Sequence, residues 1–151
     1  MLSFGSQDRG LYVKAQVTQL TGLIRLAQNE SLRRNREWGV HFEKQIYRFS
    51  EYDPIAQTWT SIVRRPFSAT QLKEDAYFKV TAETYQLNSG GVFDGEGVGE
   101  DKEDDEVDLP TIIIYSSGEH TPFTINVFSR TDELSWQITS NGLLVQMSDN
   151  A

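Results

Sequence analysis

The sequence contains two histidines, the side chains whose ordinary pKa lies near neutrality, so they are the first candidates for acid–base chemistry. His120 lies in the run Ser116–Phe123, SSGEHTPF. Ser117, His120 and Glu119 could be written as a nucleophilic triad. Neighbours within one turn rarely align a nucleophile, a base and a carboxylate, and neither serine of the run lies in a nucleophile-elbow motif. We therefore interpret Ser116–Phe123 as a rigid turn between strands.

His41 shares the alternation of Glu37 and Glu43, which predicts that its side chain lies on the solvent side of a strand. The chain has no cysteine, which excludes thiol catalysis and disulfide scaffolds. Two histidines leave too few ligands for a catalytic zinc site. The 22 acidic residues offer no distinguished pair for glycoside hydrolysis. These residue types therefore predict a protein that is not an enzyme and has no cofactor or metal.

An acidic segment, 94–108, carries the whole negative charge of −8, because nine acidic residues surround Lys102. A calcium loop that starts at Asp94 would place Val98 at a ligand position, and its glycines do not follow a phosphate-binding spacing. We therefore predict a flexible acidic insertion over 88–108 without a specific ion site. The rest of the chain is neutral, so nucleic-acid binding is not expected.

The elements that must position these residues begin with a long amphipathic helix, predicted over residues 8–35. Five apolar residues recur at steps of four and three, which places them on one face of a helix, where we expect them to pack against the rest of the domain. These are Val13, Val17, Leu20, Ile24 and Ala27. Three further apolar residues lie outside this face and are either ordinary exposed residues or contacts with neighbouring subunits: Leu11, Tyr12 and Leu26.

After residue 36 the apolar period changes from 3.6 to 2, which predicts strands. Trp38, Val40 and Phe42 begin a hairpin whose second strand contains Tyr47 and Phe49. Further strands are predicted at 56–63, 76–87, 111–116, 123–129, 134–139 and 143–147, with a hairpin turn at Asn141-Gly142. The sequence therefore predicts one α+β domain over residues 1–151, in which the helix packs on antiparallel sheets formed by residues 37–147.

The stretch from Pro110 to Phe123, PTIIIYSSGEHTPF, resembles the signature of the minor pseudopilin H of type II secretion systems. Three more stretches are similar to the same family: RLAQNE at 25–30, WGVHF at 38–42, and Trp136 followed by Asn141-Gly142 and Leu144. The acidic insertion before Pro110 resembles the variable loop of such proteins. The likeness extends from about residue 11 to residue 147.

The resemblance implies a pilin-like head domain and a structural role without cofactors. Minor pseudopilins assemble through their N-terminal helices near the tip of a periplasmic pseudopilus, beside other pseudopilins and secreted exoproteins. They are held in the inner membrane of Gram-negative bacteria by an apolar segment with a methylated mature N-terminus. We expect that segment to lie upstream of the present sequence and to be its only membrane contact. The resemblance also assigns a structural or partner-facing turn to Ser116, Ser117, Gly118, Glu119, Thr121, Pro122 and Phe123.

Two other classes of protein are compatible with the sequence. The first is a type IV pilus minor pilin that binds DNA or takes part in adhesion, which would need a basic face. Such a face could be formed by Arg33, Arg34, Arg36, Arg64 and Arg65. The second is a periplasmic carbohydrate-binding or hydrolase module with a groove lined by Trp38, Trp59 and Trp136. All three tryptophans have the alternation of core residues, which favours a core position over a groove.

Overall fold

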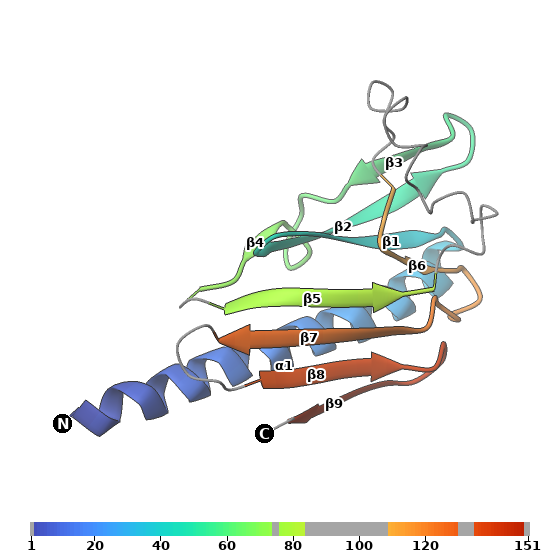
Figure 1. Ribbon diagram of the computed structural model, residues 1–151. Helices are drawn as coiled ribbons and strands as arrows, with labels where there is room; N and C mark the ends of the chain where they lie inside the picture. The colour runs from blue at the N-terminus through green and yellow to red at the C-terminus, as the bar shows by residue number, and fades with distance from the viewer. Residues whose placement is uncertain (1, 74–75, 84–108, 130–134, 150–151) are drawn as a thin grey trace, which may run out of the picture.

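A computed structural model describes residues 2–73, 76–83, 109–129 and 135–149 of the protein (Figure 1). Its first element is the helix α1 (Leu2–Arg34), which begins six residues before the predicted start. Asn35 follows with a left-handed φ of 56°. The backbone N–H of Arg36 donates to the carbonyl of Ser31 at 3.2 Å, and that of Asn35 donates to the carbonyl of Leu32 at 3.3 Å. This pair of bonds satisfies the last carbonyls of the helix and ends it.

Two antiparallel sheets follow the helix. The first has the order β3-β2-β1-β6, with β4 also paired to β2. Its strands are β1 (Trp38–Glu43), β2 (Ile46–Asp53), β3 (Thr58–Ser61), β4 (Thr70–Gln71) and β6 (Ile112–Ile114). The second has the order β5-β7-β8-β9. Its strands are β5 (Ala76–Ala82), β7 (Phe123–Ser129), β8 (Ser135–Ser140) and β9 (Val145–Asp149).

The core lies between α1 and one face of both sheets. Figure 1 shows α1 crossing behind the sheets, with its N-terminal end extending past them. Alternate residues of β7 are buried because one face of the strand points into this core. In the first sheet, the fully buried Trp38 ring lies edge-on to Phe67 at 4.8 Å between ring centroids. The predicted α+β class, with one helix packed on antiparallel sheets, is confirmed.

Several predicted boundaries differ from the observed ones. The strand predicted at 56–63 is limited to Thr58–Ser61, and the two-residue strand β4 was not predicted. The last two strands form the predicted hairpin, but residues 141–144 connect them, so β9 begins at Val145 rather than at residue 143. Asn141 explains this longer turn, because its Oδ1 accepts the backbone N–H groups of Leu143 and Leu144 at 3.0 and 3.3 Å. The acidic insertion predicted at 88–108 lies outside the described residues.

His41 does not lie in solvent, as its alternation predicted. It is 5% exposed, and its Nε2 lies 2.7 Å from Ser50 Oγ. The alternation did place His41 on the face of the sheet opposite the helix, but residues 109–111 cross this face. Gly39, two residues earlier on the same face, is so close to Pro110 that an added Cβ would lie 2.5 Å from the proline Cγ. The prediction was wrong because a distant segment covers the outer face of β1.

The core position that the alternation predicted for Trp59 is also wrong. Trp38 and Trp136 are buried, at 0% and 8% exposure, but Trp59 is only half-buried. Its ring lies 5.0 Å from that of Tyr52 on the outer face of the first sheet. The buried residue of this segment is Ile62, three positions later, and an odd separation along an extended chain places the two side chains on opposite faces. A groove lined by all three tryptophans is therefore not formed.

Candidate functional site

The helix α1 presents two different faces. The five residues predicted to contact the head, Val13, Val17, Leu20, Ile24 and Ala27, are at most 1% exposed. Leu11, Tyr12 and Leu26 are 66%, 42% and 39% exposed, and of the three Tyr12 borders the first sheet, where it lines a pocket with Tyr47 and Thr70. Gly22, on the same outer side, has no atom within 4 Å of the position of an added Cβ. The outer side of the helix is therefore open to another protein, with apolar side chains spaced along it.

The Ser116–Phe123 segment forms a tight turn between β6 and β7. The backbone N–H of Gly118 donates to the carbonyl of Tyr115, and that of Tyr115 donates to the carbonyl of Glu119, both at 2.8 Å. Gly118 has a φ of 96°, a conformation that favours glycine. Ser117 and Glu119 are exposed, Ser116, Gly118 and Pro122 are half-buried, and Thr121 and Phe123 are buried. Only the tip of the turn is therefore accessible.

Gln28 of α1 attaches this turn to the helix, and the sequence analysis did not identify it. Its Nε2 lies 3.0 Å from the carbonyl oxygen of Gly118 and 3.2 Å from that of Leu143, so one amide reaches two turns. The same nitrogen lies 3.2 Å from His120 Nδ1. A glutamine on a helix is usually read as a surface residue, so no local signal in the sequence indicates this role. The contact depends on segments about 90 and 115 residues away along the chain.

His120 is buried at the centre of this junction. Its Nε2 is hydrogen-bonded to Ser140 Oγ, and its Nδ1 faces Gln28. Ser117 Oγ instead accepts the backbone N–H of Glu119 at 3.3 Å. Both nitrogens of the imidazole are thus engaged by residues outside the hypothetical triad of Ser117, His120 and Glu119. The geometry is that of a structural histidine linking a helix and two turns.

Burial lowers the pKa of His120 below the ordinary value of 6.5, because the charged imidazolium loses its solvation. In the unfolded chain the imidazole of His120 takes up a proton near pH 6.5, whereas in the folded chain it does so only at a lower pH. The contribution of this histidine to stability should therefore be complete above pH 6.5, and should be lost as the pH falls from there through the folded-state pKa. An NMR titration of His120 should give a pKa below 6.5, and urea unfolding should show the decrease in stability. A pKa at or above 6.5 would contradict this assignment.

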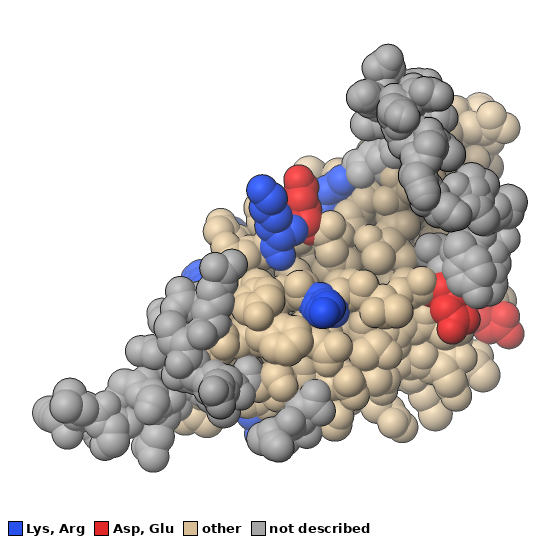
Figure 2. Space-filling model, viewed as in Figure 1, with Lys and Arg blue, Asp and Glu red and all other residues tan. Residues whose placement is uncertain are grey.

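The arginines considered for a basic face are largely engaged. Arg34 forms a two-pronged ion pair with Glu51, with its Nε 2.6 Å from Oε2, and this bond holds the pKa of Glu51 below its usual value. Arg33 and Arg64 share Glu30, at 2.8 and 3.8 Å. On the face drawn in Figure 2, the described part of the chain shows separate basic and acidic side chains rather than a continuous basic surface.

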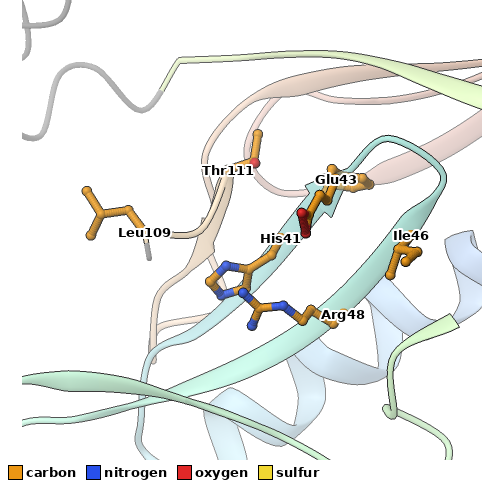
Figure 3. Close-up of a pocket in the computed structure, with 7 residues that line it drawn as sticks. His41, Glu43, Ile46, Arg48, Leu109 and Thr111 are labelled. Atoms are coloured by element: carbon orange, nitrogen blue, oxygen red, sulfur yellow. The ribbon is translucent and has the colours of Figure 1, made fainter. Parts of the chain in front are cut away.

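A small pocket of about 200 Å³ lies on the outer face of β1 and β2 (Figure 3). His41, Glu43, Ile46 and Arg48 line one side of it, and the segment from Leu109 to Thr111 lines the other. Charged groups of both signs line it. Within the described ranges, no group of three metal-ligating side chains converges here or elsewhere.

A profile of the family described as Type II transport protein GspH matches residues 16–143 of the chain. The chain belongs to the GspH family. The matched region includes the buried stripe of α1 from Val17 onward, the Ser116–Phe123 turn and the β8–β9 turn up to Leu143. The sequence resemblance to minor pseudopilin H is therefore confirmed.

Known GspH proteins are similar in sequence and in fold. Type II secretion system protein H of Pseudomonas aeruginosa is 27% identical over 133 residues, which are 88% of this chain and 73% of the relative. Two structures of the minor pseudopilin EpsH of the Vibrio cholerae type 2 secretion system give TM-scores of 0.67 and 0.65 at 19% and 22% identity. They cover 91% and 90% of this chain and 96% and 95% of theirs. The solution structure of E. coli GspH gives a TM-score of 0.65 at 14% identity, covering 93% of this chain and 89% of that chain.

At identities below 25%, the solved structures show that this GspH chain shares their fold. Among the described residues, no helix combines the length and the apolar character that a membrane crossing needs.

Proposed function

We propose that this GspH-type minor pseudopilin is a structural subunit near the tip of the periplasmic pseudopilus in type II secretion. The observation that carries this proposal is the division of α1 into two faces, one buried against the head and one open. Leu20 and Ile24 are at most 1% exposed, whereas Leu11 and Leu26 are 66% and 39% exposed. A helix fixed to its head on one side can pack against neighbouring helices on the other.

The proposed partners are other pseudopilins, which would contact the open side of α1, and secreted exoproteins, which would meet the head. The helix would continue upstream into an apolar segment in the inner membrane. Individual helix contacts can be weak in such an assembly, because anchoring in one membrane and in one fibre raises their effective concentration. The energy for fibre growth would come from another component of the system, since the role of this chain is structural.

Replacement of Leu11 and Leu26 together by glutamate in the full-length protein should reduce exoprotein secretion by about tenfold, because charges replace the apolar contacts with neighbouring helices. Secretion is measured as exoprotein activity in the culture medium of a strain that carries only the variant. The stability of the isolated head should stay within about 0.5 kcal/mol of the wild type, because both residues are substantially exposed.

The control is Leu144→Glu, which changes a leucine of the β8–β9 turn that is as exposed as Leu11. This variant should secrete normally. Leu26→Cys, treated with a bifunctional thiol-to-amine reagent, should also form a crosslink with a lysine of a neighbouring pseudopilin. Normal secretion by the Leu11 and Leu26 double variant would refute the proposed assembly face. An equal loss of secretion in Leu144→Glu would show that the effect of the double variant is not specific to this face.

A further inference from the structure

Three polar side chains attach the C-terminal part of α1 to the head. They are three residues apart, which places them on one side of the helix. Arg25 Nη2 donates to the carbonyl of Val145 at 2.6 Å, Ser31 Oγ donates to that of Tyr115 at 3.0 Å, and Gln28 lies between them. Figure 1 shows the β6–β7 and β8–β9 connections at the end of the molecule where α1 ends. The helix is therefore fixed to backbone carbonyls of the head at three successive points.

At the middle point, the amide of Gln28 determines which nitrogen of His120 carries the hydrogen. Gln28 Nε2 lies 3.2 Å from His120 Nδ1. The same atom lies 3.0 and 3.2 Å from the carbonyl oxygens of Gly118 and Leu143, so it is the nitrogen end of the amide, because an oxygen there would face two other oxygens. An amide nitrogen only donates. The neutral ring of His120 therefore accepts at Nδ1 and donates from Nε2 to Ser140 Oγ.

A proton on Nδ1 of His120 is incompatible with this arrangement. The imidazolium donates from both nitrogens, so its Nδ1–H would point at the N–H groups of Gln28. The ring is only 3% exposed, so the new donor needs an acceptor within the protein. The carbonyl of Gly118 can supply one: burial lowers the pKa of His120, and this carbonyl acts in the opposite direction by favouring the charged ring. Protonation therefore sets His120 and Gln28 in competition for one carbonyl.

The elements around His120 contribute few titratable groups. On α1 the nearest is Arg25, which is bound to the carbonyl of Val145, and in the turn they are Tyr115 and Glu119. The strands β6, β7 and β8 and residues 141–144 contain none. Among the influences on the pKa of His120, burial and the Gly118 carbonyl are present, and no charged side chain is among them. The hydrogen bonds of the ring therefore decide what its protonation changes.

We propose that the Gln28 junction, defined as the amide of Gln28 with the ring of His120 and the carbonyls of Gly118 and Leu143, is an attachment that opens when His120 is protonated. The Gly118 carbonyl would pass from Gln28 to His120, and the Leu143 carbonyl would lose its partner on α1. The two flanking attachments contain no group that titrates near neutrality. The helix would therefore stay fixed to the head while the tips of the β6–β7 and β8–β9 turns are released from it at acidic pH. This inference does not depend on the proposed assembly face.

The test is an NMR titration of the isotope-labelled chain from neutral to acidic pH. At neutral pH the nitrogen shifts of the His120 ring should show a hydrogen on Nε2 and none on Nδ1. As His120 takes up its proton, the side-chain N–H signals of Gln28 and the carbonyl carbon signal of Leu143 should shift with the same midpoint. Amide signals of β1 and β2 should stay in place, because the opening is local.

Gln28→Met removes the donor to the neutral ring but keeps a good helix former of similar length. His120 in this variant should bind its proton about threefold more tightly than in the wild type, because one hydrogen bond that favours the neutral ring is lost. The carbonyl signal of Leu143 should no longer follow the titration. The matched control is Gln19→Met, the same change at an exposed position of the same helix, which should leave the proton affinity of His120 unchanged.

Three results would overturn the proposal. The first is a hydrogen on Nδ1 of the neutral His120 ring, and the second is a set of Gln28 signals that does not follow the His120 midpoint. The third is a proton affinity in Gln28→Met that is equal to or lower than that of the wild type. Cooperative unfolding of the sheets at the His120 midpoint would also contradict it, because the junction is proposed to open in a folded head.

Discussion

Trp38→Ala should lower the free energy of unfolding by about 3–5 kcal/mol, the usual cost of removing a large aromatic side chain from a core. Trp38 is fully buried, and its ring packs edge-on against Phe67. Its Nε1 donates to Glu51 Oε2 at 3.0 Å, and the same carboxylate binds Arg34 at the end of α1. The substitution would therefore create a cavity and also remove a hydrogen bond beside the helix end. Urea unfolding followed by far-UV circular dichroism measures the change.

Two further variants separate these contributions. Trp38→Phe keeps an aromatic ring but loses the bond to Glu51, and should cost about 1 kcal/mol for that bond in addition to the smaller loss of packing. Trp59→Ala removes the same side chain from the outer face, where only the Tyr52 ring contact is lost, and should cost about 1 kcal/mol. If Trp38→Ala and Trp59→Ala had equal effects, Trp38 would not be a central core residue.

The sequence predicted those features of the fold that depend on local periodicity. The steps of four and three from Val13 to Ala27 require a helix with one buried side, and the strict alternation in 123–129 requires a strand with one buried side. Each pattern is repeated several times, so one exception does not change the period. These repeats explain why the α+β class, the helix and the longer strands were predicted correctly, whereas the two-residue strand β4 was not.

Features that depend on distant segments were not predictable in the same way. His41 has the alternation of an outer-face residue, but its burial depends on residues 109–111, about 70 positions later. Gln28 looks like a surface glutamine until the turns that contain Gly118 and Leu143 are placed beside it. Trp59 shows the opposite case, because this large aromatic residue lies near the edge of a sheet and is only half-buried, and no layer formed by the described residues covers it. Local pattern determines the face of a strand, whereas tertiary contacts determine whether that face is covered.

The Ser116–Phe123 motif depends both on local backbone conformation and on contacts with distant segments. Gly118 is required locally, since its φ of 96° is unfavourable for other residues. Thr121 and His120 are required by contacts: Thr121 covers the edge of β6, and His120 joins the turn to Ser140 and faces Gln28 of α1. The motif therefore has a structural explanation in this chain, as the connection between the helix and both sheets. This explanation is consistent with its recognition as a turn rather than as a catalytic group.

Gly39→Val should lower the free energy of unfolding by about 3 kcal/mol, because no side chain fits at this position of β1. A Cβ there would lie 2.5 and 2.6 Å from the Cγ and Cβ of Pro110, and 3.1 Å from Ser50 Oγ. The proline ring cannot rotate away, and the strand is held by β2 and β6 on its two sides. The substitution would therefore have to displace residues 109–111 from the outer face.

The matched control is Gly22→Val in α1, where nothing lies within 4 Å of an added Cβ. Valine and glycine differ little in helix propensity, so this change should stay within about 0.5 kcal/mol of the wild type. Urea unfolding of the two variants compares the same substitution at a crowded and an open glycine. Displacement of residues 109–111 should also expose His41, so the amide signals around His41 and Ser50 should shift in Gly39→Val but not in Gly22→Val. Equal stability of the two variants would mean that Pro110 does not pack on β1, and the explanation given for the burial of His41 would then be wrong.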